Sequence, residues 1–111
     1  MNDLLAWLKL QNTGIGTYIE FQKRTLRLAA GSTEQTALFQ LLAQLAGRFV
    51  IAYEDMPMDV AIAERALARL TRLVEAAAKS PGLSASEQLR LLNEIASADL
   101  GRVDALADAV G

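Results

Sequence analysis

Apolar residues recur three or four positions apart along most of this chain, and short polar stretches interrupt the pattern. Spacing of this kind is typical of amphipathic helices, which turn by about 100° per residue. No stretch alternates with the period of a strand. We therefore expect an all-α fold, in which residues 1–111 form a single compact bundle of five or six helices. The predicted helices cover about residues 4–11, 17–30, 33–53 and 57–79, with one or two more from residue 85 onward.

The segment 33–53 is the most apolar of these helices, and we expect it to be central in the bundle. Gln40, Gln44 and Arg48, spaced four residues apart, form the one stripe that would face water. Leu45 and Phe49 lie in the middle of the apolar face and are predicted to be among the most buried residues. That face covers more than half of the helix circumference and consists of Leu38, Leu41, Leu42, Leu45, Phe49, Val50 and Tyr53.

The helices on either side of this segment are amphipathic. The helix at 17–30 is expected to bury Tyr18, Phe21, Thr25, Leu28 and Ala29, and to point Lys23, Arg24 and Arg27 outward. The helix at 57–79 carries an apolar seam of Val60, Ala63, Leu67, Leu70, Val74 and Ala77. Leu73 and Ala66 widen this seam, so we expect the helix to contact two neighbours.

Capping residues predict where the helices begin and end. Asp3 is expected to cap the first helix, Gly31 to close the second in the left-handed conformation, and Pro57 to occupy the first position of the fourth. Capping boxes, in which a hydroxyl and a side chain three residues later satisfy free N–H groups, are expected at Thr17/Glu20, Ser32/Gln35 and Ser84/Glu87.

The C-terminal segment contains a conflict. As one helix from residue 85 to 110, it would place Asp99 inside an apolar face, and a lone buried carboxylate is costly. Two arrangements relieve this cost. The helix breaks near Ser97 and Asp99 caps a new helix, which is the arrangement we favour because Gly101 follows, or Asp99 pairs with an arginine.

Composition narrows the function classes. The chain is 52% hydrophobic, has a net charge of −2 and contains no cysteine or histidine. It is therefore not disordered, and it has neither disulfides nor a Cys/His metal site. Because histidine and any local nucleophile motif are absent, we expect a protein that is not an enzyme and has no cofactor. We also expect no membrane insertion, a cytoplasmic location and a bacterial origin, the last because arginine and alanine are abundant.

Two glycines at residues 14 and 16 start like a dinucleotide-binding loop. No strand precedes them, and Ile19 stands where the third glycine of that motif would be. We interpret Gly14 and Gly16 as helix breakers.

The connection near residues 54–59 combines acidic and flexible apolar side chains: Glu54, Asp55, Met56, Met58 and Asp59. The carboxylates could bind a divalent cation or stabilise the start of the next helix. Their spacing matches no calcium loop, so we do not expect a metal. Methionines beside acids also suit a loop that binds a partner, because the methionine side chain adapts its shape.

A basic stripe follows one face of the fourth predicted helix: Arg65, Arg69, Arg72 and Lys79. Such a stripe can follow phosphates, but Glu64 and Glu75 flank it and no aromatic residue interleaves for base stacking. We expect a solvated face with ion pairs within the helix, and we do not expect nucleic acid as a partner.

The first predicted helix is apolar nearly all round, with Leu4, Leu5, Trp7, Leu8 and Leu10. Such a helix must be buried, either on its own bundle or against a second subunit. We expect a homodimer or a protein partner, with these residues in or beside the interface.

The stretch from Leu83 to Gly111, especially residues 102–111 (RVDALADAVG), resembles the opening of a bacterial helix-turn-helix. The resemblance covers about a quarter of the chain and implies a DNA-associated regulatory module. We expect that motif to be incomplete, because the chain ends at Gly111, where the helix that enters the major groove would begin.

The sequence favours a non-enzymatic helical interaction module that associates with itself or with a partner. A DNA-associated regulatory module without a complete helix-turn-helix is the first alternative. The second is a bundle that holds a small apolar ligand between its helices.

Overall fold

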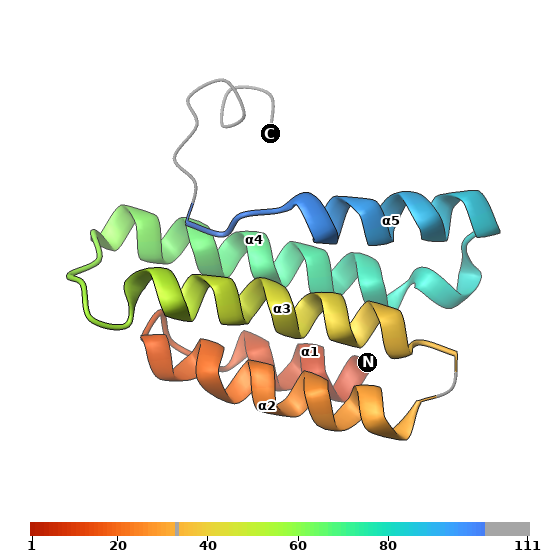
Figure 1. Ribbon diagram of the computed structural model, residues 1–111, viewed down its shortest axis with the longest axis horizontal. Helices are drawn as coiled ribbons and strands as arrows, with labels where there is room; N and C mark the ends of the chain where they lie inside the picture. Colours follow the sequence, from red (N-terminus) through yellow and green to blue (C-terminus); the bar gives the residue numbers. More distant parts are fainter. Residues whose placement is uncertain (33, 102–111) are drawn as a thin grey trace.

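The computed structural model describes residues 1–32 and 34–101 and shows a bundle of five α-helices (Figure 1). No strand occurs in these two ranges, which confirms the expected all-α fold. The helices are α1 (Asn2–Lys9), α2 (Ile15–Gly31), α3 (Thr36–Tyr53), α4 (Val60–Ala78) and α5 (Ala85–Ser97), with a short 3-10 helix η1 (Ser80–Gly82) before α5.

Successive helices from α2 to α5 run in alternating directions along the long axis of the bundle (Figure 1). The α1–α2 and α3–α4 connections therefore lie toward one end, on the left in Figure 1, and the α4–α5 connection lies at the other. The closest packing is between α2 and α3, while α5 lies against α3 and α4. The short helix α1 packs on α4 and α2.

The core is centred on α3, as the apolar pattern predicted. This helix contributes nine buried residues, more than any other, and Leu45 and Phe49 are among them. Gln40, Gln44 and Arg48 are all exposed, so the polar stripe is confirmed. The ring of Phe49 stacks between Tyr18 and Tyr53, with ring centroids 4.4 Å and 4.9 Å away.

In the α2–α3 interface, Gly47 leaves room for the flexible side chain of Gln22. A Cβ atom at this position would lie 2.6 Å from the side-chain nitrogen of Gln22 on α2. In the same interface, burial raises the pKa of Tyr18 to about 12, because an ionised phenolate would lose its hydration.

Val60 and Leu28 were expected in the core but are exposed. Val60 is the first residue of α4. Leu28 lies near the end of α2, on the side that carries Phe21 and Thr25, and is 38% exposed there. The rest of the α4 seam is buried or half-buried.

The start of α2 differs from the sequence prediction. Asn12 Oδ1 accepts a hydrogen bond from Gly14 N at 2.9 Å, so the chain turns early and α2 begins at Ile15 with Gly14 as its N-cap. Thr17 is therefore inside the helix, where its hydroxyl donates to Asn12 O at 3.0 Å. The predicted Thr17/Glu20 capping box was wrong. Gly14 precedes α2 as its N-cap, but Gly16 lies in the first turn of α2, so the interpretation of Gly16 as a helix breaker was wrong.

Other helix ends show the same dependence on local side-chain hydrogen bonds. Asp59 caps α4 by accepting from Ala61 N at 2.8 Å, so Pro57 lies in the connection rather than in the first helical turn. Ser84 accepts from Glu87 N at 3.2 Å, as predicted for α5. Ser32 accepts from Gln35 N, but this forms a turn and α3 begins at Thr36.

Two predicted helix ends were wrong. Gly31 has no positive φ, and the chain leaves α2 through an extended Ser32 instead. Asp3 lies in the first turn of α1, whose N-cap is Met1.

The break near Ser97 is confirmed. Helix α5 ends at Ser97, and Ala98 takes an extended conformation with φ −72° and ψ 151°. This break releases Asp99 from the apolar face, and its side chain is exposed.

By length and composition, α3 could cross a membrane. Half of this stretch is buried inside the bundle, and the core helix of a soluble protein passes the same test. The match is therefore weak evidence.

Candidate functional site

The α3–α4 connection is short and its backbone is held by local hydrogen bonds. Glu54 N donates to Val50 O at 2.8 Å, and Met56 N donates to Tyr53 O at 3.2 Å. The cap at Asp59 then starts α4. These hydrogen bonds hold the backbone of the connection, and the backbone determines the side of the chain from which each side chain projects.

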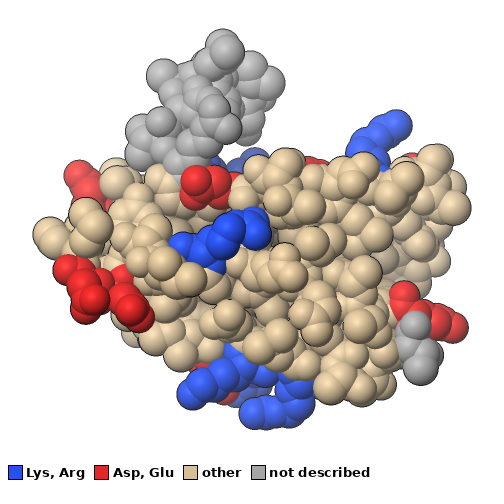
Figure 2. All heavy atoms as spheres, in the orientation of Figure 1, with Lys and Arg blue, Asp and Glu red and all other residues tan. Residues whose placement is uncertain are grey.

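Three large apolar side chains on this connection and on the helix ends beside it face solvent. Ile51 is 81% exposed, Met56 62% and Val60 70%. Glu54, Asp55 and Asp59 lie between them in the sequence and are exposed as well. We call these six residues the acidic end surface. Figure 2 shows acidic side chains gathered at this end of the molecule, over the α3–α4 connection.

The acidic end surface has a uniform sign of charge. Residues 49–64 contain four acidic residues, of which Glu64 is the fourth, and no lysine or arginine. Within the described ranges, no three acidic side chains lie close enough together to hold a metal ion. The geometry therefore favours a contact surface over a metal centre.

Met58 was expected to belong to this surface, but it is half-buried and packs against the core. The connection is irregular, so periodicity could not predict which of the two methionines points inward. Val60 was expected in the core. The exposure of Ile51 was not predicted, although helical spacing places it on the same stripe as Gln40, Gln44 and Arg48.

A second exposed surface follows the outer side of α2. Ile19, Lys23, Leu26 and Arg27 lie on one helical face, and all four are exposed. We call these four residues the basic α2 face. Basic side chains gather along α2, at the lower edge of Figure 2. The outward direction of Lys23 and Arg27 was predicted, whereas the two apolar residues between them were not.

Arg24 was also expected to point outward, but it turns toward α1. Its guanidinium lies 4.4 Å from the ring centre of Trp7 and 3.2 Å from the carboxylate of Glu20. A cation over an aromatic face is attracted by the ring quadrupole, so this contact helps to hold α1 on α2.

The apolar residues of α1 are mostly covered by the chain itself. Leu4 and Leu8 are buried in the core, and Leu5 and Trp7 pack against it. These placements correct the expected interface, because the two buried leucines are unavailable to a second subunit. Leu10, which follows α1, is 85% exposed.

The basic stripe of α4 is not uniformly solvated. Arg72 and Lys79 are exposed, whereas Arg65 and Arg69 are half-buried. Arg69 Nη1 donates to the backbone oxygens of Asp99 and Leu100, at 3.3 Å and 3.4 Å. The expected solvated face with ion pairs within the helix is therefore corrected at Arg69, which binds a distant part of the chain.

Residues 98–101 form a non-helical segment after α5, which we call the strap and which turns at Leu100 and Gly101. Four consecutive carbonyl groups of the strap accept hydrogen bonds from side chains of other helices. Besides the two bonds from Arg69, Arg48 Nη2 donates to Ala98 O at 3.2 Å and Tyr53 Oη donates to Gly101 O at 3.3 Å. Leu100 is 2% exposed.

Two further contacts shape the strap. Asp99 Oδ1 accepts from Gly101 N at 3.0 Å, and the arginine expected to pair with this carboxylate binds the backbone oxygen of the same residue instead. A Cβ atom on Gly101 would lie 2.5 Å from the ring of Tyr53, so the close approach of the strap to α3 needs glycine.

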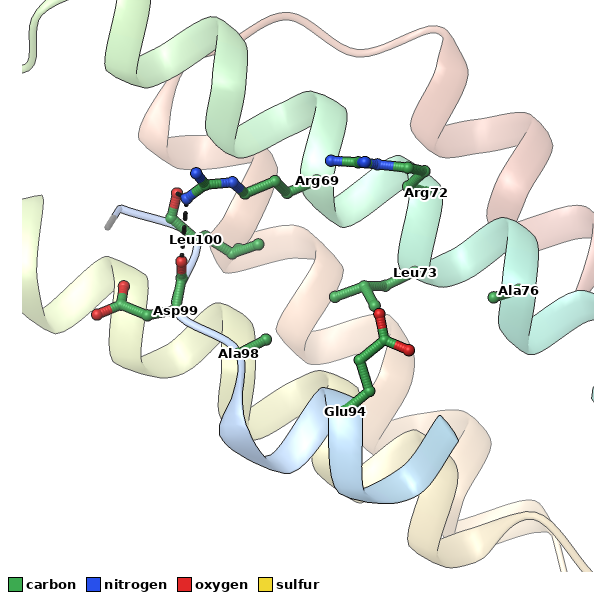
Figure 3. Close-up of a pocket in the computed structure, with 8 residues that line it drawn as sticks. All are labelled: Arg69, Arg72, Leu73, Ala76, Glu94, Ala98, Asp99 and Leu100. Carbon is green, nitrogen blue, oxygen red and sulfur yellow. Dashed lines mark hydrogen bonds between the residues drawn. The ribbon is translucent and has the colours of Figure 1, made fainter. Parts of the chain in front are cut away.

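A pocket of about 380 Å³ lies beside the strap, between α4 and α5 (Figure 3). Leu73 and Ala76 of α4 and Ala98 and Leu100 of the strap supply its apolar lining. Arg69 and Arg72 stand on the α4 side and Glu94 on the α5 side, and Figure 3 shows Arg69 reaching across to the backbone of Asp99 and Leu100.

Comparisons of the chain with protein-family models, with curated proteins and with solved structures find no match. The run 102–111, on which the resemblance to a helix-turn-helix rests, lies outside the described residues.

Proposed function

We propose that this chain is a non-enzymatic helical interaction module that binds a second copy of itself or another protein through the acidic end surface. One observation carries the proposal. Ile51, Met56 and Val60 lie within a stretch of ten residues, and each is more than 60% exposed although the backbone of the α3–α4 connection is hydrogen-bonded. Contiguous apolar surface that is rimmed by charge marks protein contact sites more often than scattered apolar residues do.

The chemistry of the surface suits this role. Met56 is unbranched and adapts its shape to a partner, while Ile51 and Val60 supply stiff apolar area at low entropic cost. Glu54, Asp55 and Asp59 form a charged rim, which selects partners by charge and raises association rates.

Site-specific photo-cross-linking tests the proposal. Met56 is replaced by the photo-cross-linker benzoylphenylalanine, and Lys79, which is exposed at the opposite end of α4, is replaced in a control. We expect a defined protein product from position 56 in cells that express the chain, and none above background from position 79. The product should disappear when Ile51→Glu is added, while circular dichroism shows an unchanged helix content.

Equal cross-linking from both positions would overturn the proposed function. Mass spectrometry of the product identifies the partner, whether it is this chain or a different protein. Either identity is consistent with an interaction module.

A second candidate function is supported by the pocket between α4 and α5. Its volume of about 380 Å³ lies within the range of small-ligand sites, and its lining is mainly apolar. A small apolar ligand retained by freshly purified protein would appear in native mass spectrometry, and Ala76→Trp should abolish its binding by filling the pocket. Purified protein with the mass of the bare chain, which also fails to bind apolar probe molecules, would exclude this candidate.

A further inference from the structure

The acidic end surface and the basic α2 face are complementary in chemistry. Each combines exposed apolar side chains with charges of one sign: Ile51, Met56 and Val60 with three carboxylates, and Ile19 and Leu26 with two cations. Burying the apolar side chains together would remove them from water, and the opposite charges would meet at the rim.

These two surfaces cannot satisfy each other within one chain. The acidic end surface lies at the α3–α4 connection, at one end of the bundle. The basic α2 face points away from the core along the side of the molecule, as the exposure of all four residues shows. In Figure 2, the acidic groups at the left end and the basic groups at the lower edge lie on separate parts of the surface. A complementary contact therefore requires two copies.

We infer that the acidic end surface of one copy docks on the basic α2 face of a second copy, with Met56 between Ile19 and Leu26 and with Glu54 and Asp55 opposite Lys23 and Arg27. This inference rests on the proposed function and names its partner. The contact joins two different patches, so it differs from a self-complementary twofold contact in which one patch meets itself.

The four charges that this contact pairs, on Lys23, Arg27, Glu54 and Asp55, are exposed and form no ion pair within residues 1–32 and 34–101. Lys23 and Arg27 are exposed on α2, whereas the neighbouring Arg24 is engaged by Glu20 and Trp7. Because the paired charges would lie at a solvent-exposed rim, added salt should screen them and weaken self-association.

Charge reversal provides the test. The first variant carries Glu54→Lys and Asp55→Lys, and the second carries Lys23→Glu and Arg27→Glu. The intact chain should self-associate in sedimentation equilibrium as its concentration rises into the high micromolar range. Each variant alone should associate at least about tenfold more weakly, because like charges then face each other. A control with Lys79→Glu and Arg90→Glu reverses two exposed charges elsewhere and should associate like the intact chain.

Mixing the two variants makes the test decisive. The first variant keeps an intact basic α2 face, and the second variant keeps an intact acidic end surface. An equimolar mixture should therefore form complexes that contain both variants. Near-ultraviolet circular dichroism of each variant checks that the fold is retained. A self-complementary contact elsewhere would be insensitive to both variants, and a contact of the acidic end surface with itself would be insensitive to the second variant.

The inference is overturned if the intact chain stays monomeric, if the variants associate like the intact chain, or if the mixture fails to associate. A monomeric chain whose position 56 cross-links to a different protein would reject only this pairing and leave the proposed function in place. A monomeric chain without such a cross-link would reject both.

Discussion

The strap and the α3–α4 connection are two non-helical segments that meet near Tyr53, yet they use their side chains in opposite ways. In the strap, Leu100 is buried and the backbone carbonyls are bound by side chains of α3 and α4. In the connection, the backbone is satisfied locally, and Met56 faces solvent. In both segments, backbone polar groups therefore have hydrogen-bond partners. The segments differ in side-chain burial, which makes the strap part of the core and leaves the connection accessible to a partner.

The largest difference is expected from truncating the central apolar side chain of each segment. Leu100→Ala should lower the free energy of unfolding by about 2–5 kcal/mol, because it leaves a cavity in the core. Met56→Ala should change it by no more than about 0.5 kcal/mol, since the side chain is already solvated. Urea denaturation of the two variants measures both values, and equal losses would remove the distinction between the segments.

A smaller effect is expected at Gly101. Gly101→Ala brings a methyl group against the ring of Tyr53 and should cost about 1–3 kcal/mol of stability. The matched control is Gly16→Ala in α2, where a Cβ atom meets nothing within 4 Å. This control should be neutral or stabilising by about 0.5–1 kcal/mol, because alanine is the better helix former. Thermal denaturation of both variants gives the comparison, which fails if Gly101→Ala is tolerated like the control.

In the connection, the stabilising residue should be the cap rather than the exposed acids. Asp59→Ala removes the acceptor for Ala61 N and should cost about 1 kcal/mol. Asp59→Asn keeps an acceptor and should be nearly neutral. Asp55→Ala, at an exposed position, should change stability by less than about 0.5 kcal/mol. Guanidinium denaturation distinguishes the three variants, and a loss at Asp55 equal to that at Asp59 would contradict this assignment.

The smallest effect on stability is expected at Tyr53. This residue is the last of α3, and its hydroxyl donates a hydrogen bond to the strap. Tyr53→Phe keeps the ring contact with Phe49 and removes the hydrogen bond to Gly101 O, at a cost of about 0.5–1.5 kcal/mol. Hydrogen exchange should show faster opening at Gly101 N, and unchanged exchange there would show that the hydroxyl contributes nothing to the strap.

Sequence reasoning predicted the helices well because burial repeats with the helical period. The central position of α3 and the break after Ser97 both followed from that period and from the cost of burying Asp99. The wrong starts of α2 and α4 share one cause. Asn12 and Asp59 form hydrogen bonds two residues ahead, and these local bonds compete with the patterns used to predict caps.

The strap and the acidic end surface were only partly predictable. Arg69 was expected to face solvent because it lies among other cations on α4, and no periodicity shows that a guanidinium reaches backbone oxygens about thirty residues away. The acids and Met56 were identified as a partner loop. The exposure of Ile51 agrees with its helical position beside Gln44 and Arg48, whereas the apolar seam of α4 gave no sign that its first residue, Val60, is exposed.

The packing of α2 on α3 has a consequence for the order of folding. These two helices are adjacent in sequence and make the closest contact in the bundle, so their pairing requires little loop-closure entropy. The strap, by contrast, joins Ala98 to Arg48 across fifty residues. Contacts with short sequence separation favour rapid folding, which makes the α2–α3 hairpin the expected nucleus and the strap a late event. Substitutions at Leu100 should then accelerate unfolding, whereas substitutions at Gly47 should slow folding.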